Sequence, residues 1–229
     1  MFEGLSMRLR AVASQVIAGE PMADIATDHG QLPVALVQSG VVPFAVALDV
    51  ADGPLAGARR AAASCMDKVS VRKSNGFEGL RQGEVRTVTI AGLGGGSMVQ
   101  ILLNGQSVWP TVSRLILQPQ GLEAEVRLVL IAAGWQCVND MIVEDRGKFY
   151  MVMAWEPGMD RKWSAEDLRW GKFIRERPDP LYARLLEHQY DVAAQAYQNM
   201  SDQGLSDHVD AQSLVEDMDR IRSEQRRIG

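Results

Sequence analysis

Short apolar runs alternate with longer amphipathic segments through the first 134 residues of the chain. The apolar runs predict five strands, over residues 21–27, 44–50, 68–76, 87–93 and 113–120. The segments before and between them predict helices over residues 7–16, 32–40, 54–65, 97–104 and 122–134. Strands that alternate with helices in this way form a parallel sheet covered on both faces, so the pattern predicts an α/β fold.

The alternation of strands and helices ends after residue 134. Residues 135–145 and 148–157 both read as strands, and only Arg146 and Gly147 separate them. Such a spacing predicts an antiparallel hairpin rather than another strand–helix–strand unit. Five parallel strands followed by a reversed hairpin are typical of the Rossmann-like sheet of class I methyltransferases. The pattern therefore favours a methyl donor over a dinucleotide.

The strand signal disappears from Met159 onward, so we expect a sheet domain over residues 1–158 and a helical domain over 159–229. Ser164 is placed as the N-cap of a helix over 164–177, and Pro178 and Pro180 end that segment. Two longer helical segments follow, divided near Gly204. The last carries one apolar stripe, which predicts an antiparallel helix pair of coiled-coil type; the stripe consists of Ala211, Leu214, Met218 and Ile221.

Composition narrows the class of protein. The chain has 229 residues, of which 46% are hydrophobic and 23% charged, and these values are ordinary for a globular protein. No apolar run approaches the ~20 residues of a membrane span, and the N-terminal segment makes a poor secretory signal. Cys65 and Cys137 form no CxxC pair, and His29, His188 and His208 are scattered. We therefore expect a cytoplasmic protein with no membrane contact and no metal site.

Net charge is −5, which lowers the expectation of a nucleic-acid partner without removing it, because a local basic patch can hold phosphates. Residues 59–86 carry a net charge of +4 and residues 161–184 a net charge of +3. Either segment could equally be a solvated face of a helix or strand.

Candidate chemistry follows the predicted strands, because ligands of open parallel sheets bind at the carboxyl ends of the strands. Asp49 ends the second strand, where a carboxylate accepts hydrogen bonds from ribose hydroxyls. Asn75 ends the third, where an amide can read an adenine edge. The residues that we expect to bind the cofactor are Asp24, Ala26, Thr27, His29, Gly30, Asp49, Val50, Asn75, Gly76, Ala91 and Leu93.

The glycine run after the fourth strand looks at first like a phosphate-binding turn. A dinucleotide fingerprint needs a small third residue, but the series is Gly92, Gly94 and then Ser97. It also needs an acidic residue after the next strand, which instead ends in "LQPQ". The glycines are better explained as a loop with little side-chain cover, against which a flat base could lie.

Seven motifs in order resemble the bacterial tRNA (adenine-22-N1)-methyltransferases over nearly the whole chain. They are "LSMRLRAVASQV", "ADIATDHGQLP", "VADGPLAGAR", "VSVRKSNG", "IAGLGGGSM", "LILQPQ" and "WSAEDLRWGKF". The resemblance implies S-adenosyl-L-methionine as cofactor, tRNA as partner and a C-terminal coiled-coil domain; it leaves the oligomeric state open. The chain departs from the family pattern at Ala26, usually glycine, at Gln31, usually tyrosine or a similar residue, and at Gln120, usually asparagine.

The implied reaction is methyl transfer to the N1 lone pair of an adenine. This nucleophile carries no proton, so no general base is assigned. We expect catalysis from positioning and from acceptors that face the developing positive charge, at Asp28, Gly92, Gln118 and Gln120. N1 is hidden in a base pair, so the base must be unpaired or flipped out. RNA contacts are expected at Gly94, Gly95, Arg169, Lys172 and Arg175.

Three alternatives remain open from the sequence. The first is a methyltransferase of the same fold with another RNA or a small molecule as acceptor, which the departures at Gln31 and Gln120 motivate. The second is a non-catalytic RNA-binding or scaffold protein. The third, a NAD-dependent oxidoreductase, is disfavoured by the broken fingerprint.

Overall fold

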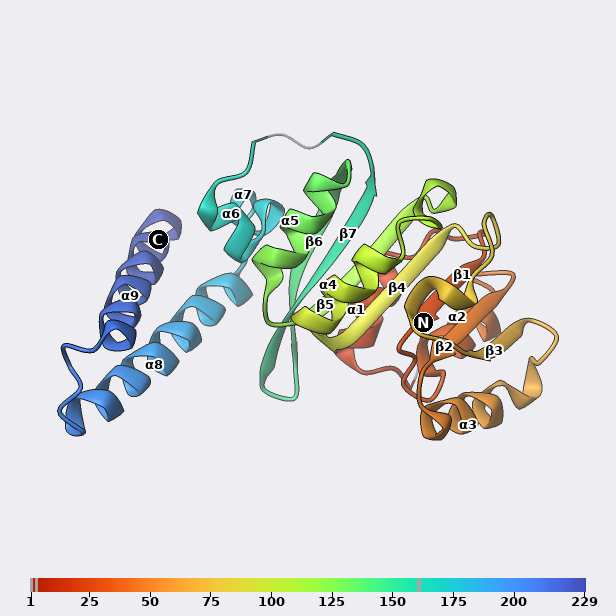
Figure 1. Cartoon of the computed structure of the whole chain (residues 1–229), viewed down its shortest axis with the longest axis horizontal. Helices are drawn as coiled ribbons and strands as arrows, with labels where there is room; N and C mark the ends of the chain where they lie inside the picture. Colours follow the sequence, from red (N-terminus) through yellow and green to blue (C-terminus); the bar gives the residue numbers. More distant parts are fainter. Residues whose placement is uncertain (1, 3, 160–161) are drawn as a thin grey trace. The chain divides into compact units, whose positions relative to one another are not determined.

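One seven-stranded sheet organises the first part of the chain (Figure 1). The computed structural model describes residues 2, 4–159 and 162–229. The strand order is β3-β2-β1-β4-β5-β7-β6, and β7 runs antiparallel to its neighbours. The strands are β1 (Met22–Ile25), β2 (Ala45–Asp49), β3 (Val69–Lys73), β4 (Thr87–Gly94), β5 (Arg114–Gln120), β6 (Trp135–Asp145) and β7 (Lys148–Pro157). The predicted parallel sheet and its closing hairpin are confirmed.

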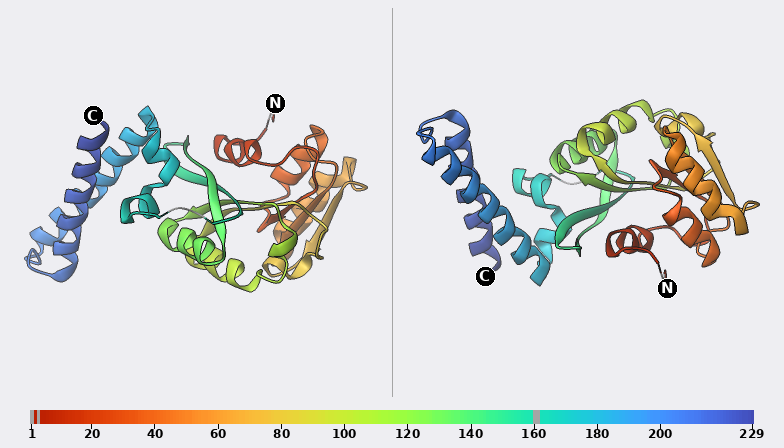
Figure 2. Two further views of the ribbon diagram at one scale, coloured as in Figure 1. Left: turned by 90° about the horizontal axis from the view of Figure 1, so that it is seen from above. Right: turned by 90° about the horizontal axis from the view of Figure 1, so that it is seen from below.

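Helices cover both faces of this sheet, as Figure 2 shows for α1 on one side and α4 and α5 on the other. They are α1 (Met7–Ser14), α2 (Gln31–Gln38), α3 (Asp52–Ala61), α4 (Gly95–Asn104) and α5 (Glu123–Ala132). Three short 3-10 turns lie in the connections that lead to β3, β4 and β5, at Ala62–Ser64, Gly76–Gly79 and Trp109–Thr111. The buried apolar residues form two clusters. One includes residues of α4 and α5, and the other includes residues of α1 and α2.

The central strands are buried on both faces, which explains why they read as continuous apolar runs rather than as alternating ones. All four residues of β1 are buried, and so are Thr87–Ile90 of β4. The chain crosses from β3 at one edge back to β4, which lies on the other side of β1. Strand order reverses at the β1–β4 pair, and this is the place where open α/β sheets leave a crevice for ligands.

The glycine run is the main local difference from the expected fold. No separate loop exists there, because β4 continues through Gly94 and α4 begins directly at Gly95. Gly94 pairs with Gln120 of β5, and the pairing register shifts between Ala91 and Leu93. Gly92 occupies that bulge with a φ of +82°, a conformation that favours glycine. Strand pairing therefore holds Gly94, which the sequence analysis assigns to a loop.

The chain divides into two compact units, Met1–Phe173 and Ile174–Gly229. Residues 162–173 belong to the first unit, because Trp163 stacks on Trp155 at a centroid distance of 5.7 Å and Trp170 is buried. Buried Arg127 adds a bond from its guanidinium to the Leu168 carbonyl, 2.6 Å long. The compact units thus divide after Phe173. The domain boundary at 158/159 stays a prediction.

Four further helices complete the fold: α6 (Ala165–Trp170), α7 (Lys172–Glu176), α8 (Pro180–Asp202) and α9 (Val209–Ile228). Ser164 caps α6 as predicted, and the Asp167 carboxylate completes a capping box. Gly171, with a φ of +93°, separates α6 from α7, so the single helix expected over 164–177 is wrong.

The second unit is mainly the pair α8 and α9, which run antiparallel. Tyr182 near the start of α8 donates to Glu224 near the end of α9, over 2.8 Å. Leu185 and Ala193 of α8 and Ala211 and Ile221 of α9 are buried. The helix pair is confirmed, whereas its coiled-coil geometry stays a prediction.

Candidate functional site

A cavity of about 440 Å³ lies at the carboxyl ends of β1 to β4. Six of the residues expected to bind the cofactor line it: Ala26, Asp49, Val50, Asn75, Gly76 and Leu93. The remaining lining includes Ser97, Gln100 and Asn104 of α4, which the sequence analysis missed. Their spacing of three and four residues places them on one helix face, and this polar stripe was the signal available in the sequence. The volume lies in the range of small-molecule sites.

Asp49 ends β2 with one carboxylate oxygen engaged and one available. Its Oδ1 accepts the Ala51 backbone N–H at 2.7 Å, which fixes the side chain at the mouth of the cavity. Its Oδ2 has no hydrogen-bond partner among the described residues. A carboxylate held this way can accept from a ligand hydroxyl, in keeping with the ribose contact predicted for it.

The loop that follows β1 is conformationally strained. Ala26 and His29 have φ values of +58° and +54°, which non-glycine residues rarely adopt, and Gly30 has a φ of +70°. The His29 ring fixes the loop against α3, since a β-carbon added at Gly57 would overlap His29 Nδ1. Asp28 lies 3.5 Å from the same ring, and both side chains are more than half exposed. Strain of this kind clusters at functional sites.

The family's usual glycine has a physical reason at Ala26, where the backbone enters the left-handed region. Alanine at this position carries a backbone penalty of about 1 kcal/mol relative to glycine. Thr27 is buried, and its backbone N–H donates to the Leu48 carbonyl at 2.9 Å. This bond ties the loop to β2, on the side where Asp49 ends the strand.

Asp24 lies within β1 and under the loop rather than at the cavity lining. Its carboxylate accepts the Thr89 hydroxyl at 2.6 Å. Burial raises the pKa of Asp24 to about 6, although the hydrogen bond from Thr89 and the charge of Arg8 oppose the rise. The structure therefore places a buried carboxylate, mostly ionised at neutral pH, behind the loop.

Arg8 is a neighbour of two predicted site residues, Gln118 and Gly92, that the sequence analysis missed. It comes from α1, and its guanidinium NH1 donates to Gln118 Oε1 at 2.9 Å. The same nitrogen would lie 3.2 Å from a β-carbon added at Gly92. The signal available in the sequence was an arginine beside the buried positions Leu9 and Val12 of an amphipathic helix.

Gln118, predicted as a direct acceptor for developing charge, is buried and already bonded at both ends of its amide. Its oxygen accepts from Arg8, and its nitrogen donates to the Pro119 carbonyl at 2.8 Å. Gln118 is therefore engaged within the protein at both polar groups of its amide. Gln120, two residues further along β5, is exposed and pairs in register with Gly94, so its side chain remains available.

The glycines beside Gln120 differ from one another in what surrounds them. A β-carbon at Gly94 would meet no atom within 4 Å, whereas one at Gly95 would overlap the Gly121 carbonyl oxygen. Gly95 is thus required by packing, which is the ordinary structural explanation for a glycine. Gly94 is free of that requirement, so a flat ligand could approach the backbone there. Ala91 pairs with Gln118 one step below the bulge.

The three cations predicted to hold RNA make protein contacts. The Arg169 guanidinium lies 4.7 Å from the Trp170 ring centroid, and Lys172 Nζ lies 5.6 Å from that of Trp163. Arg175 donates twice to Glu224, at 2.9 and 3.1 Å. This geometry pairs Arg175 with Glu224 and leaves its side chain only 16% exposed, so little of it could meet phosphates. Arg161, part of the same basic segment, lies outside the described residues.

No group of three or more His, Cys, Asp and Glu side chains is gathered as a metal ion would require within residues 2, 4–159 and 162–229. None of the helices in this part of the chain is both long and apolar enough to cross a membrane.

Comparison with known proteins defines the class of the chain. Residues 5–153 match the sequence profile of a methyltransferase-domain family. Together with the sheet order and the closing hairpin, this match identifies the first unit as a methyltransferase domain of the class I fold.

The particular family follows from full-length relatives. The chain is 30% identical over 225 residues to the tRNA (adenine(22)-N(1))-methyltransferase of Bacillus subtilis strain 168, covering 95% of this chain and 94% of the relative. It belongs to the tRNA (adenine(22)-N(1))-methyltransferase family.

Solved structures agree with this assignment. A Streptococcus pneumoniae protein crystallised in complex with S-adenosyl-L-methionine is 32% identical, with a TM-score of 0.87 and coverage of 96% of this chain and 99% of that chain. The Bacillus subtilis m1A22 tRNA methyltransferase is 28% identical, with a TM-score of 0.83 and coverage of 96% and 98%.

Proposed function

We propose that this protein transfers a methyl group from S-adenosyl-L-methionine to N1 of adenine 22 in tRNA. The observation that carries the proposal is the cavity that Asp49, Asn75 and Gly76 line, with Leu93 at its β4 side and the uncovered Gly94 next along the strand. Relatives that match nearly the whole chain carry the same activity in their names. A tRNA substrate also implies a cytoplasmic location.

The residues present fit the methyl donor. Asp49 offers an unengaged carboxylate oxygen for the ribose hydroxyls, and Asn75 stands exposed at the end of β3 for the adenine edge. When bound, the donor supplies an electrophilic methyl group on a sulfonium. Asp24 places a buried carboxylate behind the loop, and such a charge favours a cationic ligand nearby.

The chain's own residues contribute mainly position and electrostatics. Adenine N1 attacks with a lone pair and loses no proton, so no side chain needs to act as a base. The exposed amide of Gln120 lies beside Gly94 and can present its oxygen to the base as positive charge develops. Gln118 instead fixes Arg8 beside Gly92, and this contact shapes the wall of the site.

Mass spectrometry of nucleosides tests the proposal. Unmodified tRNA incubated with the protein and the methyl donor is expected to yield 1-methyladenosine, and fragment mapping is expected to place it at position 22. A transcript with guanine at that position is the matched control and should remain unmethylated. Absence of methylated adenine from the first sample would contradict the proposed acceptor.

The departures at Gln31 and Gln120 favour one second candidate, the same methyl transfer to a different acceptor. Gln31 begins α2 and Gln120 ends β5, and both side chains are exposed. Methylated nucleosides other than 1-methyladenosine in the same experiment would support this candidate. A protein without saturable heat on titration with the donor would instead be a non-catalytic relative.

A further inference from the structure

The charges of the second unit are separated along its length. Residues 188–219, named here the acidic end, hold seven Asp and Glu side chains and no Lys or Arg. Residues 174–187 and 220–229, named the arginine end, hold seven Arg side chains and four Asp and Glu. The antiparallel pairing of α8 and α9 brings the two segments of the arginine end together, as the Tyr182–Glu224 bond shows.

Part of the arginine end is internal structure. Buried Glu224 accepts hydrogen bonds from Arg175, Arg227 and Tyr182. Burial alone would raise the pKa of the Glu224 carboxyl, but these bonds outweigh it and hold the pKa at about 2. Arg175 and Arg227 thus neutralise an internal carboxylate and stabilise the helix pair.

Five further arginines are exposed. Arg177, Arg184, Arg220, Arg222 and Arg226 all face solvent, and Arg222 also stacks on Tyr190 at 4.7 Å. Every cation at this end is an arginine, whose planar fork of donors suits phosphate oxygens. The exposed charge of the arginine end is therefore of the kind that holds a nucleic-acid backbone.

The far parts of the two ends act as separate charges. A helix of 20 residues, the length of α9, is about 30 Å long, and the Debye length at physiological salt is about 8 Å. The acidic side chains near the start of α9 therefore do not cancel the field of the arginines in its last turn, and they repel a polyanion at the other extremity of the same unit.

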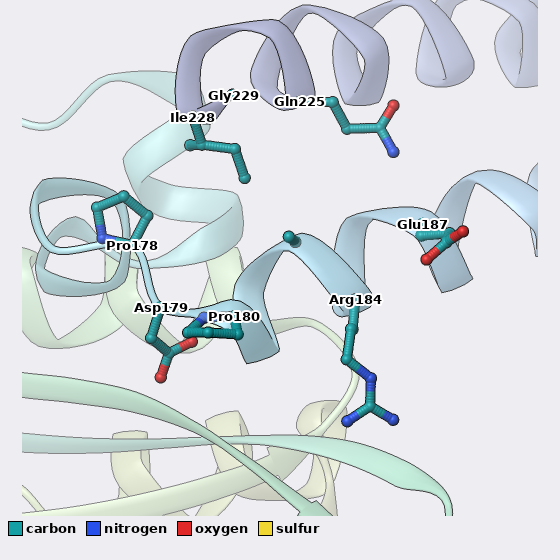
Figure 3. A pocket seen from close by; sticks show the side chains of 9 residues that line it. Pro178, Asp179, Pro180, Arg184, Glu187, Gln225, Ile228 and Gly229 are labelled. Atoms are coloured by element: carbon teal, nitrogen blue, oxygen red, sulfur yellow. The ribbon is translucent and has the colours of Figure 1, made fainter.

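An open pocket of about 530 Å³ lies at the arginine end, between the start of α8 and the last turn of α9 (Figure 3). Its lining contains two carboxylates, of Asp179 and Glu187, and one guanidinium, of Arg184. This balance is unsuited to a phosphate. The pocket is therefore not the anion site, and the exposed arginines outside it carry the positive charge.

We infer that the tRNA backbone docks on the arginine end of the helix pair and that the acidic end stays out of contact with RNA. The inference rests on the proposed tRNA substrate, and it specifies which end of the second unit contacts the tRNA. It also replaces Arg175, which was expected to contact RNA, with exposed arginines of the same unit.

The test compares two triple variants that alter equal numbers of charges. The first is Arg177→Gln, Arg220→Gln, Arg226→Gln, and its control at the acidic end is Asp191→Asn, Asp207→Asn, Glu216→Gln. All six side chains are exposed. Measured over a salt series, the arginine variant should bind tRNA at least about tenfold more weakly, and its salt slope should fall by up to about 3. The control should keep the wild-type affinity within about twofold.

Donor affinity and melting temperature are measured on both variants, and both should match the wild type. The inference is overturned if the arginine variant binds tRNA like the wild type or if the control weakens binding equally. Failure of this inference can be distinguished from failure of the proposed function. A wild-type protein that bound tRNA through the arginine end without methylating it would disprove only the function.

Discussion

At the scale of single residues, Asp49 carries the clearest prediction about the methyl donor. Its Oδ2 has no partner among the described residues, so a ribose hydroxyl would gain a charge-assisted hydrogen bond there. Asp49→Ala should weaken donor binding about tenfold or more, as measured by calorimetry. Asp52→Ala is the matched control, since Asp52 pairs with Lys73 on the surface and should leave the dissociation constant unchanged. An unaltered constant for Asp49→Ala would show that the ribose lies elsewhere.

Arg8 is expected to position groups rather than to bind the donor. It holds the Gln118 amide and stands beside Gly92, so its loss should displace the wall of the site by a fraction of an ångström. Arg8→Ala should lower kcat about 10- to 100-fold, with the donor dissociation constant unchanged. Arg8→Lys, which keeps a donor for Gln118, should recover part of that loss.

The control for Arg8 lies on the same helix. Arg10 is exposed, and its Nε donates to the Leu5 carbonyl at 2.9 Å, so Arg10→Ala should keep the wild-type kcat. A purely structural role for Arg8 would show as a lowered melting temperature that accounts for the lost activity. A donor constant that weakened in step with kcat would assign Arg8 to donor binding instead.

At the scale of elements, two adjacent glycines at the junction of β4 and α4 have different surroundings, so their substitutions should have different effects on stability and on activity. Gly94 has a φ of −58° and free space around it, so Gly94→Ala should leave stability within about 0.5 kcal/mol of wild type. Its methyl group would cover the surface that we assign to the base, so tRNA methylation should fall at unchanged donor affinity.

Gly95 provides the contrast. Alanine there would overlap the Gly121 carbonyl oxygen, so Gly95→Ala should lose about 1 to 3 kcal/mol of stability in urea unfolding. If Gly94→Ala methylated tRNA at the wild-type rate, the base would not lie against that residue. Equal loss of stability in both variants would show instead that the two glycines share one packing role.

The same junction shows what the sequence could and could not predict. The strands and helices of the sheet were predictable because their apolar periodicity is local. The run Gly92–Gly96 was not, because pairing of Gly94 with Gln120 extends β4 through Gly94, and α4 then begins at Gly95. Asp49 and Asn75 could be placed from their positions at strand ends. Arg8 could not be placed from the sequence. Its contact with Gln118 of β5, which is 110 residues away, forms only when α1 packs beside that strand.

At the scale of the whole molecule, the two units divide the tasks that the proposed reaction requires. The donor cavity is lined entirely by residues of the first unit, whereas the arginine end belongs entirely to the second. Arg175 illustrates why the second unit was harder to read from sequence. Its partner Glu224 lies 49 residues away, so only the folded helix pair shows that this cation is internal.

This division leads to a prediction about Glu224. The folded pKa of about 2 lies below the ordinary value of 4.5, so the carboxylate stabilises the second unit above about pH 4.5 and loses that contribution as pH falls toward 2. Glu224→Gln removes the charge that Arg175 and Arg227 share, and loss of a buried pair costs about 3 kcal/mol. The variant should therefore unfold its helical unit at lower urea concentration at pH 7, with a difference from wild type that shrinks toward pH 3.

The first unit supplies the internal control for the same variant. Because the donor cavity contains no residue of the second unit, calorimetry should give Glu224→Gln the wild-type affinity for S-adenosyl-L-methionine. Its affinity for tRNA should fall, since the exposed arginines lose the helix pair that presents them. A variant that lost donor binding together with tRNA binding would show that the two units fold as one cooperative body. In that case, the charge separation along α8 and α9 could not be tested by weakening the helix pair, and only the surface variants would report on it.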